Sequence, residues 1–137
     1  MTHIYDWGLY GPDVIAITCP RCGGEARFES SFYNDESGCR CREENGKCTC
    51  LLCGYGNHHL LKWPDDAYFT VDIDDMSLWA WNRNHAIAIR DFIASTTRDV
   101  SAYPGYKQSL LHLPSCVLEN SSRHLAVKRI NQMLDAV

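Results

Sequence analysis

The sequence predicts an α+β protein, with short strands in the first half of the chain, a β-hairpin after them and two helices towards the C-terminus. One observation behind this prediction is a Cys-x-x-Cys-Gly sequence that occurs twice, at residues 19–23 and 50–54. The other is a change of hydrophobic period, because apolar residues form short β-branched or alternating runs up to Trp81 and follow a helical period from Asn82. With 137 residues, 45% of them hydrophobic, the chain suits one domain, or a small core with a metal-stapled subdomain.

The two cysteine pairs are typical of a metal site. We call residues 19–24 the first knuckle and residues 50–55 the second knuckle. Two residues between the cysteines let one tight turn direct both sulfur atoms to a single point, and the glycine that follows, Gly23 or Gly54, can adopt the positive φ needed to leave the turn. Structural Zn²⁺ takes four thiolates at the corners of a tetrahedron. We therefore predict one structural zinc ion, with the ligands Cys19, Cys22, Cys50 and Cys53.

The segments around the knuckles are predicted to be antiparallel strands. Residues 14–17 are a short β-branched run that leads into the first knuckle, and residues 25–33 alternate between polar and apolar side chains. Three strands that carry the two knuckles make a small zinc ribbon, which we assign to residues 1–63. The segment between the knuckles is longer than the roughly 15–20 residues usual for this pattern, but extra loop length costs little free energy.

A hairpin is predicted over residues 39–50. Its turn is placed at Asn45-Gly46, the dipeptide most typical of a two-residue hairpin turn. With this turn, the strand register places Cys41 opposite Cys50 and Glu43 opposite Cys48.

Residues 64–137 are predicted to form a second β-hairpin with a helical region packed on it. Residues 67–73 and 77–81 are the expected strands, on either side of Asp74-Asp75. Trp79 and Trp81 point to one face of the second strand, where we expect core because aromatic side chains bury large areas.

The change of period at Asn82 predicts a helix that begins after this N-cap residue and ends near Ser95. A loop is expected over residues 96–108, with a turn at 103–106, and a short helical turn over 110–114. A final amphipathic helix begins near residues 120–122. Its apolar stripe consists of Leu125 or Ala126, Ile130, Met133, Leu134 and Val137, with Arg123, Lys128 and Arg129 facing outward.

Four cysteines remain outside the predicted site: Cys39, Cys41, Cys48 and Cys116. A competing ligand set uses Cys39 and Cys41, but Cys-x-Cys on a strand splays the two sulfur atoms, whereas Cys-x-x-Cys brings them together. A second metal bound by Cys39, Cys41 and Cys48, with His58 or His59, is an alternative to the reduced, buried thiols that we favour. For Cys116, alone after Pro114, we expect an ordinary packed position.

The apolar runs and the first residues of the chain indicate where in the cell the protein is found. No apolar run reaches the roughly 18 residues that cross a bilayer, and the first residues lack the basic start and apolar stretch of a signal peptide. We therefore expect a cytoplasmic protein with no membrane partner. In a reducing compartment, the eight cysteines bind metal more readily than they form disulfides.

No catalytic constellation accompanies the cysteines. Four thiolates leave no open position for a water molecule, which a catalytic zinc site requires. The sequence contains no His-Glu-x-x-His, glycine-rich phosphate loop or Gly-x-Ser-x-Gly motif. We therefore expect a non-enzymatic protein with no small-molecule substrate.

Two stretches carry a resemblance. Cys19-Pro-Arg-Cys22-Gly-Gly and Cys48-Thr-Cys50-Leu-Leu-Cys53-Gly-Tyr resemble a transcription-factor-IIB-type zinc ribbon. The order of ribbon, then Ser77-Leu-Trp-Ala-Trp-Asn-Arg-Asn-His85, then a last helix is similar to a group of small bacterial zinc-ribbon proteins of unassigned function. The element Ser109-Leu-Leu-His-Leu-Pro114 matches that group in part, although Cys116-Val117 replaces the tryptophan expected there. The resemblance implies a structural zinc on the four knuckle cysteines.

Two functions compete. The favoured one is a protein-interaction module, such as an acidic immunity-type inhibitor of a toxin or enzyme, because the formal net charge is −4 at pH 7. Its acidic cluster would be Asp65, Asp66, Asp72, Asp74 and Asp75. The alternative is a nucleic-acid-binding ribbon of a transcription or replication accessory protein. Its contacts would be Arg21, Arg27, Arg40, Arg42 and Lys47, with Phe28, Phe32 or Tyr33 stacking on bases, although Glu25, Glu29, Glu43 and Glu44 interleave with these basic residues.

Overall fold

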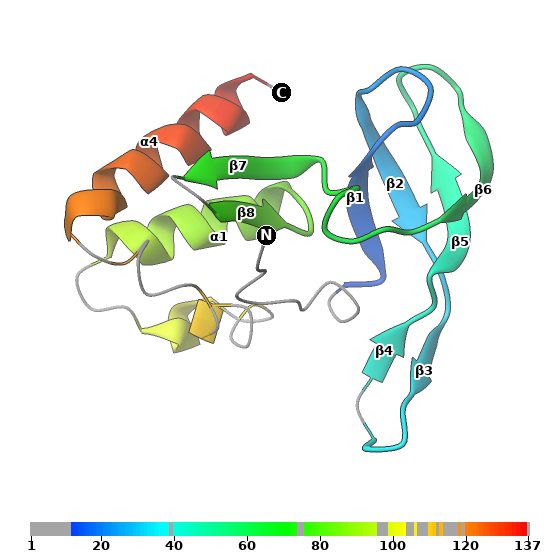
Figure 1. Cartoon of the computed structure of the whole chain (residues 1–137), viewed down its shortest axis with the longest axis horizontal. Coiled ribbons are helices and arrows are strands. Elements are labelled where there is room, and N and C mark those ends of the chain that lie inside the picture. Colours follow the sequence, from blue (N-terminus) through cyan, green and yellow to red (C-terminus); the bar gives the residue numbers. More distant parts are fainter. Residues whose placement is uncertain are drawn as a thin grey trace. The chain divides into compact units, whose positions relative to one another are not determined.

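The computed structural model describes residues 12–38, 40–73, 76–95, 99–103, 106, 110–111, 113, 118 and 120–136. The described residues belong to two compact units, of which one ends at Tyr68 and the other begins at Phe69 (Figure 1). We call them the ribbon unit and the helical unit. The predicted α+β class is confirmed, because antiparallel sheets come first and two long helices follow.

The ribbon unit is built on a four-stranded antiparallel sheet with the strand order β1-β2-β5-β6. These strands are β1 (Val14–Thr18), β2 (Glu25–Glu29), β5 (Asn45–Thr49) and β6 (Gly56–Leu60). The predicted sheet had three strands; the fourth, β6, begins directly after the second knuckle. A separate two-stranded hairpin, β3 (Phe32–Asn34) with β4 (Arg40–Arg42), forms an arm between β2 and β5 (Figure 1).

The predicted turn at Asn45-Gly46 is wrong. Both residues lie in β5, where Gly46 pairs with His59. A Cβ atom on Gly46 would lie 2.3 Å from the carbonyl oxygen of Glu29 and 2.6 Å from Cζ of Phe28. Glycine is therefore needed here for the close approach of β2, not for a positive φ.

The chain reverses instead in the segment that joins β3 to β4, where Gly38 has a φ of 83°. This reversal changes the register on both sides. Cys41 pairs with Tyr33, and Cys48 lies between Phe28 on β2 and Asn57 on β6. The predicted pairings of Cys41 with Cys50 and of Glu43 with Cys48 are therefore also wrong.

One face of the four-stranded sheet carries the core of the ribbon unit. Ile15, Ile17, Phe28 and Cys48 are each 0% exposed. The segment after β6 returns to β1, where Ala67 forms an isolated bridge with Ile17. The Asp66 side chain stabilises this segment. Its Oδ2 accepts a hydrogen bond from the Lys62 N–H at 2.8 Å and lies 2.9 Å from Nε2 of His59.

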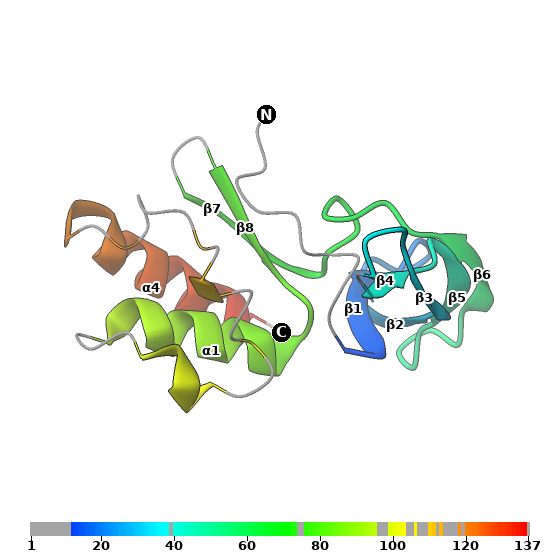
Figure 2. The ribbon, with the colours of Figure 1, turned by 90° about the horizontal axis from the view of Figure 1, so that it is seen from below.

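The helical unit contains the predicted hairpin and both predicted helices. The hairpin pairs β7 (Phe69–Ile73) with β8 (Met76–Ala80), and α1 (Arg83–Ala94) lies beside α4 (Asn120–Asp135) in both views (Figure 1 and Figure 2). A short 3-10 helix, η1 (Val100–Ala102), follows α1. No helix of the described part of the chain is long and apolar enough to cross a membrane.

Local signals located these helices well. Asn82 caps α1 as predicted, with its side chain accepting from the His85 N–H at 2.8 Å, and the predicted apolar stripe is buried at Ala86, Ile89 and Ile93. In α4 the buried positions are Ala126, Ile130 and Leu134. Trp79 and Trp81, 2% and 4% exposed, are buried as predicted. Asp74, Asp75, Pro114 and Val137 lie outside the described residues.

His85 is the centre of an aromatic stack in this unit. Its ring stacks on Trp81, with 4.5 Å between the ring centroids, and on Tyr106, with 4.8 Å. Its Nδ1 accepts from the Trp81 N–H at 2.9 Å. Burial lowers the pKa of His85 to about 3, so the ring is neutral at physiological pH.

Candidate metal centre

The two knuckles have the same backbone hydrogen bonds. In each, the first cysteine accepts from the N–H four residues later and donates to the carbonyl five residues later, at 2.8 to 3.0 Å. The pairs are Cys19 with Gly23 and Gly24, and Cys50 with Gly54 and Tyr55. Gly23 and Gly54 have φ angles of 76° and 79°, as the sequence predicted. The same local sequence therefore builds the same loop twice, between β1 and β2 and between β5 and β6.

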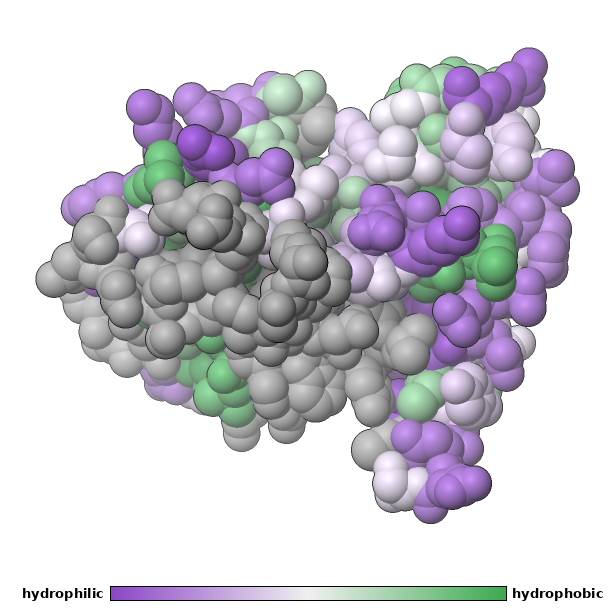
Figure 3. Space-filling model, viewed as in Figure 1, coloured by the Kyte–Doolittle hydropathy of each residue, from purple (hydrophilic) through white to green (hydrophobic). Residues whose placement is uncertain are grey.

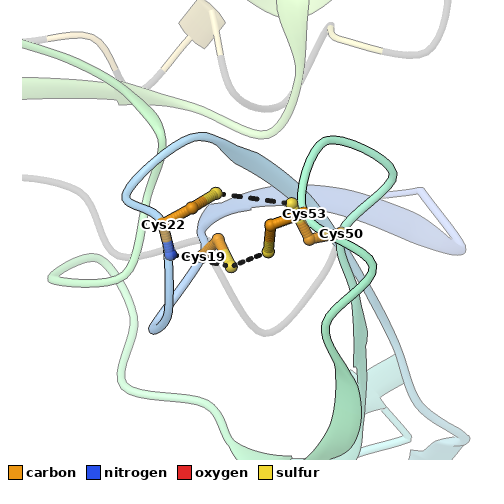
Figure 4. A group of neighbouring side chains, drawn as sticks. All are labelled: Cys19, Cys22, Cys50 and Cys53. Carbon is orange, nitrogen blue, oxygen red and sulfur yellow. Dashed lines mark hydrogen bonds between the residues drawn. The ribbon is translucent and has the colours of Figure 1, made fainter.

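The loops bring the four predicted cysteines together. Their Sγ atoms all lie within 4.8 Å of one another, and they point into the space between the two knuckles (Figure 4). The Sγ atoms of Cys19 and Cys53 are 3.7 Å apart, as are those of Cys22 and Cys50. Four sulfurs at 2.3 Å from Zn²⁺ in a tetrahedron are about 3.8 Å apart. The thiols are therefore spaced to hold one metal ion of this kind.

Backbone amides support the first knuckle's sulfur atoms. The N–H groups of Arg21 and Cys22 donate to Cys19 Sγ at 3.4 and 3.5 Å, and the Gly24 N–H donates to Cys22 Sγ at 3.4 Å. Such bonds stabilise the thiolate form, which is the form that binds a metal.

Hydrogen bonds within the site shift the pKa values of Cys19 and Cys53 in opposite directions. Burial raises the pKa of Cys19, but hydrogen bonds from the Cys22 and Arg21 N–H groups and from the Cys53 and Cys22 thiols together lower it to about 6. The Tyr55 backbone lowers the pKa of Cys53, but burial and the other three thiols raise it to about 12. A bound cation would favour the thiolate form of Cys53, whose pKa otherwise lies far above neutral pH.

The remaining thiols form no second cluster among the described residues. There, the knuckle cysteines are the one group of three or more metal-binding side chains. Cys41 and Cys48 are buried, and burial, together with the nearby Cys19 and Cys50, raises the pKa of Cys48. Cys39 and Cys116 lie outside the described residues.

Two of the residues predicted to contact nucleic acid are buried. Phe28 is 0% exposed and Arg42 is 1% exposed, so neither reaches a base or a phosphate. The Arg42 guanidinium donates to the backbone carbonyls of Pro12 and Asp13. Burial lowers its pKa to about 10, and it remains charged at neutral pH.

Arg40 is engaged within the arm. Its guanidinium carbon lies 3.6 Å from the centroid of the Phe32 ring, and its Nη2 lies 3.2 Å from Oδ1 of Asp13. Arg21, Arg27 and Lys47 are exposed, and Arg27 lies 3.8 Å from Glu29. The basic surface of the ribbon unit is thus smaller than its arginine count indicates.

The acidic residues singled out in the sequence are divided between the two units. Asp65 and Asp66 belong to the ribbon unit, where Asp66 holds the segment after β6, and Asp72 belongs to the helical unit. Asp74 and Asp75 lie outside the described residues.

Sequence reasoning missed the apolar surface of the second knuckle. Leu51 and Leu52 are 80% and 73% exposed, directly between the two ligand cysteines. A Cβ on Gly24 would lie 2.6 Å from Cδ1 of Leu52, so the second glycine of the first knuckle makes room for this side chain. Their position in the motif could have predicted this exposure, because the two residues inside a Cys-x-x-Cys turn face away from the metal. On the face in Figure 3 the ribbon unit is mainly hydrophilic, with small separate apolar patches.

Comparison with protein-family models, curated proteins and solved structures gives no match. The geometry of the cysteines is consistent with a zinc ribbon, and this geometry carries the assignment.

Proposed function

We propose that this chain is a non-enzymatic, cytoplasmic zinc-ribbon protein that acts as a protein-interaction module. Zinc is the metal that best suits four cysteine sulfurs spaced for a tetrahedron. With all four positions taken by protein sulfur, the metal has a structural role and holds the two knuckle loops together.

The observation that carries the interaction proposal is the exposure of Leu51 and Leu52, at 80% and 73%. Two adjacent leucines in solvent cost free energy unless another surface covers them, at about 25 cal/mol per Å² of apolar area. The metal fixes the loop that presents them, so a partner pays little conformational entropy to order it. A rigid apolar protrusion of this kind suits a groove on another protein.

The net charge of −4 supports a partner with a basic surface around that groove. An immunity-type inhibitor of a basic toxin or enzyme is the subclass that we favour. The transcription-factor-IIB-type resemblance suggests instead a nucleic-acid role, and the exposed Arg21, Arg27 and Lys47 are the residues on which that role would depend.

A quantitative capture experiment tests the proposal. The zinc-loaded full chain is used as bait in extract of the source cell, beside the double variant Leu51→Ser/Leu52→Ser. The matched control is Tyr33→Ser, which removes a 45% exposed aromatic from the arm of the same unit. We expect a protein captured equally by wild type and control, and at least about ten-fold less by the double variant, since ten-fold corresponds to about 1.4 kcal/mol.

Equal capture by all three baits would show that Leu51 and Leu52 do not contribute to partner binding. A fluorescence titration with single-stranded nucleic acid is the second arm. Binding that weakens steeply with salt, and is lost on Arg21→Gln, would replace the protein-interaction proposal with the nucleic-acid one.

A further inference from the structure

The four-stranded sheet of the ribbon unit has two edge strands that differ in how they are covered. At β1, the segment after β6 returns and pairs with the edge: the Thr18 N–H donates to the Asp66 carbonyl at 2.9 Å, and the Tyr68 N–H donates to the Ala16 carbonyl at 3.3 Å. At the other end of the strand order is β6, and no described segment pairs with its outer edge (Figure 1).

The outward backbone groups of β6 follow from its pairing with β5. The Leu61 N–H donates to the Glu44 carbonyl, and the Cys50 N–H donates to the Tyr55 carbonyl, each at 2.8 Å. Hydrogen-bonded pairs alternate along an antiparallel ladder, so Asn57 and His59 also face β5. The N–H and C=O groups of Gly56, His58 and Leu60 therefore point away from the sheet.

One of these outward groups has a local partner. The His58 N–H donates to Oδ1 of the preceding Asn57 at 2.8 Å. For the other outward groups, no partner is recorded within the described residues. An edge strand with such groups is a template for a further strand.

The side chains of this edge fit those of an identical strand. Gly56, His58 and Leu60 lie on one face of β6, because alternate residues of a strand share a face. Leu60 is 52% exposed, and a Cβ built on Gly56 meets nothing within 4 Å. His58 lies midway between them. A two-fold axis through His58 would therefore place Leu60 of each copy over Gly56 of the other.

We propose that two copies of this chain associate through β6, which pairs antiparallel with β6 of the second copy about a two-fold axis at His58. The Gly56 and Leu60 backbones exchange hydrogen bonds across the axis, and the two His58 residues do the same after Asn57 releases the His58 N–H. Two four-stranded sheets then become one continuous eight-stranded sheet.

Charge does not oppose this pairing. β6 contains no Asp, Glu, Lys or Arg, and the charged residue paired with His58 is Lys47 on β5. Across the new junction, the two Lys47 residues would be three strand spacings apart, about 14 Å. That separation exceeds the Debye length of about 8 Å at physiological ionic strength. Because one five-residue strand pair is a small interface, we expect a dissociation constant on the order of 100 µM.

Sedimentation equilibrium of the zinc-loaded full chain, from about 10 µM to about 1 mM, tests the association. The average mass should rise from 15.6 kDa towards twice that value. Leu60→Lys should weaken the dimer at least about ten-fold, because it places a charge at the junction. Tyr33→Lys introduces the same charge at another exposed side chain of the ribbon unit and should associate like the wild type. A wild type that stays at 15.6 kDa throughout, or a Leu60→Lys variant that associates unchanged, would overturn the proposal.

Exchanging the two facing residues tests the register. Gly56→Leu alone puts two leucines against each other, and Leu60→Gly alone leaves two glycines, so each should weaken the dimer. The swapped variant Gly56→Leu/Leu60→Gly recreates a leucine over a glycine at both places and should be tighter than either single variant. If the swapped variant is no tighter than the single variants, the two-fold axis does not pass through His58 and the proposal fails. Amide NMR spectra check that each variant is folded.

Discussion

Replacing Gly46 by alanine tests the fold, because the change in the free energy of unfolding has opposite signs for a crowded and for an open position. An alanine at a strand position with room for it stabilises a protein by about 0.4–1 kcal/mol, because glycine loses more conformational entropy on folding. At Gly46 the added Cβ would meet the Glu29 carbonyl oxygen at 2.3 Å and Phe28 Cζ at 2.6 Å. The contact with backbone cannot be relieved by a rotamer change. Overpacking of this kind costs about 1–3 kcal/mol, so we expect Gly46→Ala to be net destabilising.

The matched control is Gly56→Ala. Both glycines lie in strands of the same sheet and neither has a positive φ, but a Cβ at Gly56 meets nothing within 4 Å. In protein kept dilute enough to remain monomeric, we expect Gly56→Ala to be neutral or stabilising by up to about 1 kcal/mol.

The assay is urea unfolding of the zinc-loaded protein, followed by the amide NMR signals of Phe28 and Cys48 so that the ribbon unit is observed by itself. The midpoint should fall for Gly46→Ala and should not fall for Gly56→Ala, with unchanged m-values. A Gly46→Ala protein as stable as the wild type would contradict the close approach of β2 to β5. That result would support the exposed turn that the sequence predicted at Asn45-Gly46.

Three further predictions concern the metal, the buried histidine and a helix cap. Elemental analysis should find one zinc per chain. Cys50→Ser should unfold the ribbon unit, because the free energy of metal binding contributes directly to its folding. A Cys50→Ser protein that still binds one full equivalent of zinc would indicate that Cys39 or Cys41 is a ligand instead. His85 has a pKa of about 3 in the fold against an ordinary 6.5. The unfolded chain therefore takes up a proton that the folded chain does not, and this contribution to stability is full above pH 6.5 and lost as the pH falls towards 3. Between pH 6.5 and pH 5 the helical unit should lose about 1.6 kcal/mol by urea unfolding, and the loss should vanish in His85→Asn; an equal pH dependence in that variant would refute the assignment. Asn82→Ala should cost the helical unit about 1 kcal/mol through the lost N-cap, and a change below about 0.3 kcal/mol would contradict the cap.

The sequence determined those features whose causes are local. Each knuckle is specified within six residues, because two cysteines and a glycine suffice to shape the turn and direct the sulfur atoms. For the same reason Asn82 located the start of α1, and the spacing of Ala86, Ile89 and Ile93 identified its buried face. The candidate ligands were therefore found before any strand partner was known.

Only the tertiary structure decided which segments lie against one another. Asn45-Gly46 has the local chemistry of a turn, but the backbone of β2 lies so close that glycine is used for its small size instead. Arg42 looks like a surface cation in the sequence, yet carbonyls from a segment about thirty residues earlier accept its hydrogen bonds and hold it in the interior. Strand order, register and burial depend on contacts between residues distant in the chain, and a pattern read along neighbouring residues does not contain them.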